Sequence, residues 1–138
     1  MAKVGPVKLK VHLKGSEATV DVAYDITFEA NDQASNPTYE EVCRLIGDDT
    51  DVGDPATAGA DDTLGFLTPL FTKDTASDGT PMLSRHWNKT FRKGDLDEDR
   101  GPIPDPDEIR ALVTLTPVPP ATGAPVRRES NLVKKTIV

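Results

Sequence analysis

Residues 18–30 read Ala-Thr-Val-Asp-Val-Ala-Tyr-Asp-Ile-Thr-Phe-Glu-Ala, and apolar and polar side chains alternate along them. One parity holds Ala18, Val20, Val22, Tyr24, Ile26, Phe28 and Ala30, whereas the other holds Thr19, Asp21, Ala23, Asp25, Thr27 and Glu29. Successive side chains of a strand point to opposite faces of a sheet, so this pattern predicts a long β-strand with one apolar and one polar face. The apolar face requires a second layer to cover it.

The segment before it, Val7–Lys14, alternates in the same way, and Gly15–Glu17 supplies a short turn between the two. Two alternating runs joined by three turn-forming residues predict an antiparallel hairpin. Opposite charges stand on the polar sides of the two strands. We expect cross-strand pairs there between Lys8, Lys10 and Lys14 on one strand and Asp21, Asp25 and Glu29 on the other.

Residues 38–47 fit two structures. As a helix, Thr38 and Glu41 form a capping box and Gly47 ends the element. As a strand, the segment places Glu41 on its apolar face, which counts against it. The β-rich context nevertheless favours the strand, because tertiary packing often overrides local propensity.

Four further segments are predicted strands: Leu64–Thr72, which contains Pro69 and is therefore an edge strand, Met82–Phe91, Asp107–Thr116 and Asn131–Val138. The connections are predicted loops because Gly, Pro, Asp and Asn recur in them: Asn31–Pro37, Asp48–Thr63, Lys73–Thr80, Arg92–Pro106 and Val118–Ser130. About seven strands without a long helix predict an all-β chain, a two-sheet antiparallel β-sandwich forming one domain over residues 1–138.

In strand number, spacing and its single tryptophan, Trp87, the chain resembles immunoglobulin-like and fibronectin type III-like sandwiches. The resemblance implies two packed antiparallel sheets. With Cys43 as its only cysteine, the chain lacks the disulfide between the sheets of antibody domains, and Trp87 falls in the fifth predicted strand instead of the third. The resemblance therefore concerns architecture, which does not specify a function.

Composition restricts the classes of partner. The chain has 138 residues and a net charge of −7, whereas binding to a nucleic-acid backbone needs a surplus of Lys and Arg. No apolar run approaches the roughly 20 residues that span a bilayer. The N-terminal residues lack the apolar stretch of a signal peptide. We therefore expect neither nucleic-acid binding nor membrane insertion, and a cytoplasmic protein unless a leader has been removed.

Two of the predicted loops are rich in aspartate, and the Greek-key order of a sandwich places both at the same end of the domain. Calcium takes several carboxylate and carbonyl oxygens, so these loops are candidates for a Ca²⁺ site. The candidate ligands are Asp48, Asp49, Asp51, Asp95, Asp97 and Asp99. The alternative is that aspartate is simply a common turn residue that keeps an exposed end soluble.

Association is the second functional hypothesis. The opposite end carries Arg127 and Arg128, so copies of the domain can stack head to tail with an acidic end against a basic one. The final segment, which includes Leu132 and Val133, is also a candidate for strand addition to a neighbouring sheet. Its alternative role is to complete its own sheet, since exposed edges are usually avoided.

The sequence does not favour an enzyme. His12 and His86 are the only histidines, both are predicted to face solvent, and neither is spaced to form a catalytic or metal site with Cys43. Trp87 is predicted to lie in the core with Leu83 and Phe91, and its alternative role is a stacking platform for carbohydrate. The sequence therefore predicts a non-catalytic structural or protein-interaction module, with calcium or carbohydrate binding as the alternative function.

Overall fold

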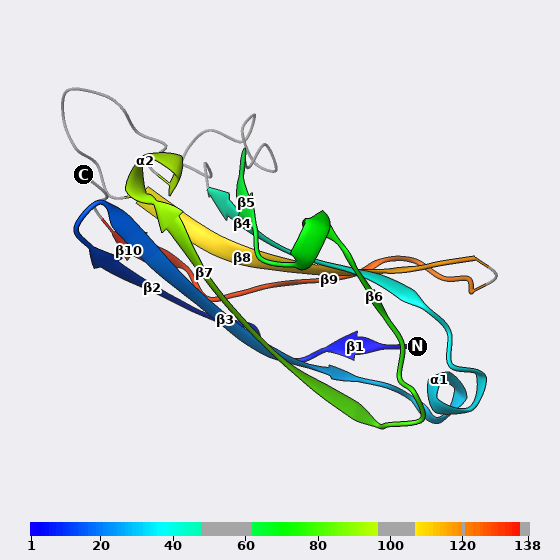
Figure 1. Ribbon diagram of the computed structural model, residues 1–138. Helices are drawn as coiled ribbons and strands as arrows, with labels where there is room; N and C mark the ends of the chain where they lie inside the picture. The colour runs from blue at the N-terminus through cyan, green and yellow to red at the C-terminus, as the bar shows by residue number, and fades with distance from the viewer. Residues whose placement is uncertain (48–61, 97–106, 120, 136–138) are drawn as a thin grey trace, which may run out of the picture.

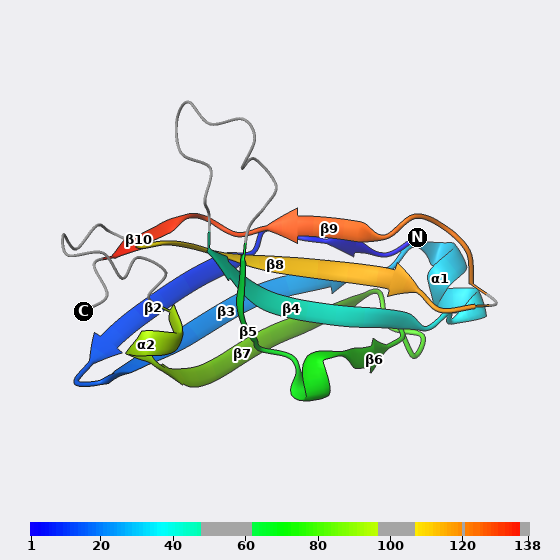
Figure 2. The ribbon, with the colours of Figure 1, turned by 90° about the horizontal axis from the view of Figure 1, so that it is seen from above.

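The computed structural model describes residues 1–47, 62–96, 107–119 and 121–135. Two antiparallel sheets lie face to face, as Figures 1 and 2 show. In the first sheet, β3 (Glu17–Thr27) pairs along its whole length with β7 (Met82–Arg92). On its other side β3 pairs with β1 (Lys3–Val4) and then with β2 (Lys8–Lys14).

The second sheet is built around β4 (Tyr39–Gly47) and β8 (Asp107–Pro117), which pair along β4's full length. β5 (Asp62–Phe66) and β6 (Lys73–Thr75) pair with the outer side of β4. β9 (Val126–Glu129) and β10 (Val133–Lys135) pair with the outer side of β8. The two-sheet antiparallel sandwich predicted from the sequence is confirmed.

The core lies between the apolar faces of the two sheets. Val20, Val22 and Ile26 of β3 are fully buried, and so are the inward residues of β8: Ile109, Ala111, Val113 and Leu115. Each buried Val, Leu or Ile side chain contributes about 1.5–3 kcal/mol through removal of apolar surface from water. The alternation that predicted these strands therefore identifies the side chains that hold the sheets together.

Residues 39–47 form a strand, as the β-rich context predicted, and the helix alternative is wrong. Glu41, the residue that argued against a strand, does lie on the buried face and is fully buried. Hydrogen bonds from Tyr24, Thr75 and Arg85 compensate it there. The polar residue on the apolar face is thus a partnered group and not an error in the pattern.

Several predicted connections contain short elements. The segment predicted as a loop at 31–37 begins with α1 (Ala30–Ser35), because Glu29 and Asp32 form a capping box; β3 consequently ends at Thr27. β6 lies within 73–80, and α2 (Lys93–Leu96) begins the segment 92–106. A 3₁₀ turn, η1 (Pro69–Phe71), follows the edge strand β5.

The predicted cross-strand charge pairs are only partly correct. Lys10 does lie opposite Asp21, but the register places Lys8 opposite Ala23 and Lys14 opposite Glu17. Asp25 accepts a hydrogen bond from Ser84 of β7. The turn length sets this register, whereas charge matching at an exposed surface contributes too little energy to move it.

One side of the sandwich is closed by hydrogen bonds between the sheets. The side-chain amide of Asn131 accepts from the Leu9 N–H at 2.8 Å and donates to the Leu9 carbonyl at 3.1 Å. Val7 forms a bridge with Ser130, and the Arg128 guanidinium donates to the Val4 carbonyl at 3.2 Å. We call this side the closed seam: residues 4–9 against residues 128–131.

Candidate docking surface

The opposite side of the sandwich is finished differently. There β7 of the first sheet runs past β5, η1 and β6 of the second sheet, and we call this side the open seam (Figure 2). The Lys89 ammonium donates to the Phe66 carbonyl at 2.9 Å, and the Arg85 guanidinium donates to Thr75 Oγ1 at 3.1 Å. Within the described residues, β7 makes these bonds across the seam through its side chains, whereas its main chain bonds only toward β3.

The hydrogen bonds of the closed seam determine which residues of β7 direct their backbone N–H and C=O away from β3. Leu9 directs both its N–H and its C=O toward Asn131, and therefore away from β3. Leu9 lies opposite Val22, and Val22 lies opposite Trp87. Because backbone groups alternate in direction along a strand, Val22 and Trp87 bond to each other. The residues of β7 whose backbone groups point outward are therefore Met82, Ser84, His86, Asn88, Thr90 and Arg92.

A buried polar cluster fixes β7 in place along this seam. The Arg85 guanidinium Nε lies 3.1 Å and 3.3 Å from the two carboxylate oxygens of Glu41. Tyr24 donates its hydroxyl to the same carboxylate, and Thr75 does so at 2.6 Å. The Trp87 indole N–H donates to the Tyr24 hydroxyl oxygen at 2.9 Å. Burial and the neighbouring Glu41 charge raise the pKa of Tyr24, which therefore stays a neutral donor.

Trp87 therefore faces inward and packs against the core, as predicted. Its indole N–H is already used inside the sandwich, which disfavours the alternative role as a carbohydrate platform. The hydrogen-bonded Glu41–Arg85 pair is a structural feature: its members are held by each other and by hydroxyl groups, and removal of one leaves the other charge buried.

The second feature of the open seam is an exposed apolar turn. Leu70 is 93% exposed and Phe71 is 62% exposed. Both have a left-handed backbone, with φ of 50° and 73°, which costs a non-glycine residue about 1 kcal/mol or more. Thr68 Oγ1 holds the turn by donating to the Phe71 carbonyl at 2.8 Å, and the Phe71 ring packs edge-on against Phe66 with ring centroids 4.7 Å apart.

Close packing beside the turn explains how β5 approaches β7. A Cβ placed on Gly65 would lie 2.4 Å from Cε1 of the Phe91 ring. Only glycine leaves room for that ring, which is almost fully buried. The Gly65–Phe91 contact thus permits the second sheet to close over β7 at this point.

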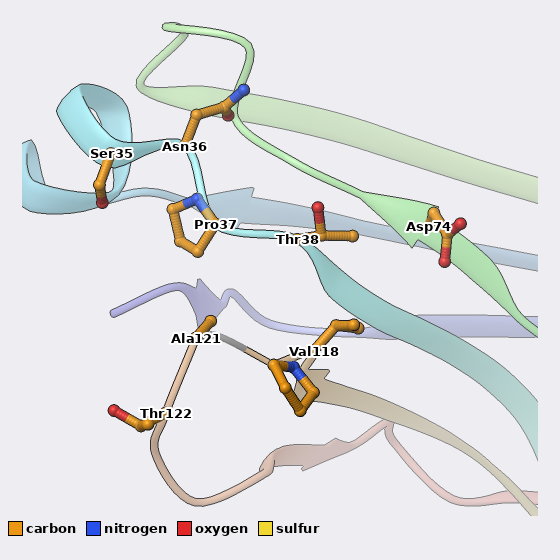
Figure 3. Close-up of a pocket in the computed structure, with 9 residues that line it drawn as sticks. Ser35, Asn36, Pro37, Thr38, Asp74, Val118, Ala121 and Thr122 are labelled. Atoms are coloured by element: carbon orange, nitrogen blue, oxygen red, sulfur yellow. The ribbon is translucent and has the colours of Figure 1, made fainter.

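A hollow lies at the end of the domain that carries α1. Its volume is about 530 Å³, and Figure 3 shows the side chains of Thr38, Asp74, Val118 and Thr122 around it. Asn36 also lines it, but its side-chain oxygen accepts hydrogen bonds from Ser77 and Asp78. Among the described residues of this lining, Asp74 is the one titratable group, so they supply no acid–base pair.

A second hollow, of about 340 Å³, lies on the outer face of the first sheet between Lys8, Lys10 and His86. His86 Nε2 is 3.1 Å from Asp21 Oδ1, and the Asn88 amide donates to the same oxygen at 2.6 Å. The hydrogen bond from Asn88, followed by that to His86, lowers the pKa of Asp21. This histidine is thus on the exposed face, as predicted, and so is His12.

The calcium hypothesis concerns residues that are largely outside the described chain. Asp48, Asp49, Asp51, Asp97 and Asp99 lie outside the described residues, and Asp95 is exposed in α2. The strand ends that flank the acidic segments, Gly47 and Ile109, pair with each other and so lie at one end of the sheet. Among the described residues, no group of three or more His, Cys, Asp or Glu side chains is arranged to hold a metal ion.

The four predicted interaction residues lie on or near the closed seam. Arg128 donates to the Val4 carbonyl, and Val133 pairs with Ile109 in β10. Arg127 is exposed in β9, and Leu132 is 39% exposed. The described part of the last segment thus completes its own sheet, which was the alternative to strand addition.

Sequence reasoning missed the apolar turn, because Leu64–Thr72 was predicted as one edge strand. Pro69 was the available signal: it cannot donate to a strand ladder, and two large apolar residues follow it that alternation cannot assign to either face. Sequence reasoning also placed Trp87 correctly without showing that β7 is an edge.

Comparison of the chain with known protein families, with curated proteins and with solved structures found no match. Among the described residues, no helix combines the length and the apolar character needed to cross a membrane.

Proposed function

We propose that the chain is a non-catalytic structural module that associates through its open seam with copies of itself. The observation that carries the proposal is the turn at 69–71, which exposes Leu70 and Phe71 although both occupy a strained backbone conformation. Strain that persists at an exposed apolar site indicates a functional contact, since neither solubility nor stability benefits from it.

The seam also offers unpaired main-chain groups beside the apolar turn. Edges of this kind are normally blocked, and the closed seam shows how this chain blocks the other one. A second copy fits the requirement well, because antiparallel pairing of two copies covers the β7 edge of both at once.

The finer likeness to immunoglobulin-like sandwiches supports this proposal. In chain order, β2, β3 and β7 share one sheet while β4, β8 and β9 share the other, as the A-B-E and C-F-G strands do in such sandwiches. We propose that the chain belongs to this architectural class. Many domains with this architecture act by binding other proteins, although the fold alone does not establish it.

Sedimentation velocity of the purified chain from micromolar to millimolar concentration tests self-association. We expect the wild-type chain to shift reversibly from monomer to dimer as its concentration rises. The double variant Leu70→Ser/Phe71→Ser should associate more weakly. The matched control is Leu132→Ser, an exposed leucine beside the closed seam, which we expect to leave association unchanged. A chain that stays monomeric at every concentration would refute the proposal.

A further inference from the structure

The sequence of β7 is self-complementary about its central residue. Four of the five residue pairs at equal distances from Trp87 are chemically similar: Leu83 and Phe91, Ser84 and Thr90, Arg85 and Lys89, His86 and Asn88. The outermost pair, Met82 and Arg92, is not. In an antiparallel pair of two β7 strands centred on Trp87, these residues lie opposite each other. From this symmetry and the unpaired edge, we infer that two copies associate by pairing their β7 strands, which deepens the proposed self-association.

The backbone geometry of the free edge permits this register. The N–H and C=O of Trp87 point toward β3, so two facing Trp87 residues form a pair without hydrogen bonds between them. On either side of that pair, His86 faces Asn88 of the second copy, and both direct their backbone groups outward. Strand pairing therefore uses outward groups at every hydrogen-bonded position.

The side-chain pairs are favourable on both faces. On the inner face an aliphatic residue meets an aromatic one, Leu83 with Phe91, and the two indoles of Trp87 come together. On the outer face two hydroxyl residues, Ser84 and Thr90, are opposite each other. The one like-charged pair is Arg85 with Lys89, and Arg85 is already neutralised by Glu41.

The apolar turn lies where the second copy would meet it. The chain crosses the seam from Phe66, which is bonded to Lys89, to Thr75, which is bonded to Arg85. The turn between them, η1, therefore lies between the contacts of Lys89 and Arg85, the stretch of β7 that is centred on Trp87. A two-fold axis through Trp87 brings the Leu70 and Phe71 side chains of both copies together.

The experiment removes one outward N–H from β7. Thr90 directs its N–H to the free edge, so Thr90→Pro blocks pairing with a second copy while leaving the β3 ladder intact. Thr90→Ala is the matched control, because it changes the same side chain and keeps the N–H. Sedimentation velocity should show association weakened about tenfold or more in Thr90→Pro and unchanged in Thr90→Ala. Circular dichroism verifies that both variants fold.

Disulfide cross-linking tests the β7–β7 register directly, and it also serves if Thr90→Pro does not fold. His86→Cys and Asn88→Cys are made separately and mixed under mild oxidation. Residues opposite each other have Cα atoms about 5.5 Å apart, within disulfide range, whereas like residues lie diagonally at about 7–8 Å. The mixture should form a disulfide-linked dimer and each variant alone should not; Cys43 is fully buried and does not interfere.

The outcomes separate this inference from the proposed function. A wild-type chain that never associates overturns both. Association that survives Thr90→Pro in a folded chain, or cysteines that cross-link no better in the mixture than alone, overturns β7 pairing and leaves self-association standing. Salt adds a further check: β7 pairing joins edges of like charge and should strengthen with salt, whereas stacking of an acidic end on Arg127 and Arg128 should weaken.

Discussion

The two seams of this sandwich differ in how they treat the exposed backbone groups of an edge strand. At the closed seam, the Asn131 amide substitutes for a neighbouring strand and satisfies both backbone groups of Leu9. At the open seam, long side chains cross between the sheets but leave the outward backbone groups of β7 without a partner in the described chain. The comparison shows that sheet-to-sheet attachment and edge protection are separate tasks, and that the open seam performs only the first.

The largest effect is expected at the buried ion pair of the open seam. Arg85→Met leaves the Glu41 carboxylate fully buried without its cation, which should lower the free energy of unfolding by about 3–5 kcal/mol. Urea unfolding monitored by Trp87 fluorescence measures it. Arg127→Met, at an exposed arginine of β9, is the control and should change stability by less than about 0.5 kcal/mol. A loss below about 1 kcal/mol at Arg85 would show that the ion pair does not hold the open seam.

The second-largest loss of stability is expected at the contact between β5 and β7. Gly65→Ala places a Cβ in the space of the Phe91 ring and should lower the free energy of unfolding by about 2 kcal/mol, because a packed ring must move. Gly94→Ala is the control, since a Cβ there meets nothing within 4 Å. If Gly65→Ala cost as much stability in a Phe91→Leu background as in the wild type, the clash with the ring would not be the cause.

A smaller effect is expected at the closed seam. Asn131→Ala removes two hydrogen bonds to Leu9 and should lower the free energy of unfolding by about 1 kcal/mol. It should also create a second free edge, so the Leu9 amide should exchange its hydrogen faster and the chain should aggregate at high concentration. Asn131→Asp, which keeps the acceptor for the Leu9 N–H, should preserve the slow exchange of that amide. Equal exchange in all three chains would contradict the role of Asn131.

The smallest effect separates stability from association at the apolar turn. Leu70→Gly should raise the free energy of unfolding by about 0.5 kcal/mol, since relief of left-handed strain slightly exceeds the entropy that glycine adds to the unfolded chain. The same change should weaken association, because the exposed leucine is lost. Leu132→Gly, at a leucine without positive φ, should lower stability. A destabilised Leu70→Gly chain would mean that the turn is not strained.

Much of the fold could be predicted because it depends on alternation. The parity of residues 18–28 and of 109–115 identified the buried faces correctly. Alternation fails where a single residue is set by tertiary contacts: Glu41 looked misplaced until its partners from β3, β6 and β7 were brought together. Three elements far apart in the sequence compensate that charge, and no local pattern records this.

The open seam was less accessible to sequence reasoning than the core. Whether a strand is central or at an edge depends on the order of strands in the sheet, and the pattern of β7 reads the same in either position. The conformation of Leu70 and Phe71 was equally hidden, since left-handed backbone is rare for such residues and sequence patterns reserve it for glycine and asparagine. The charged ends are predicted from connection order, and they stay a prediction, because the acidic segments lie almost entirely outside the described residues.

The single thiol of this chain, Cys43, can report how often the folded structure opens. Cys43 has no exposed surface, and burial raises the pKa of its thiol, so reagents that require a thiolate do not reach it in the folded chain. Its carbonyl accepts hydrogen bonds from the Leu67 and Thr68 amides, directly before the apolar turn. The rate at which Cys43 is alkylated therefore measures how often the segment that bears the turn separates from the sheets. If association suppresses this opening, alkylation becomes slower at higher protein concentration, and no added probe is needed to detect it.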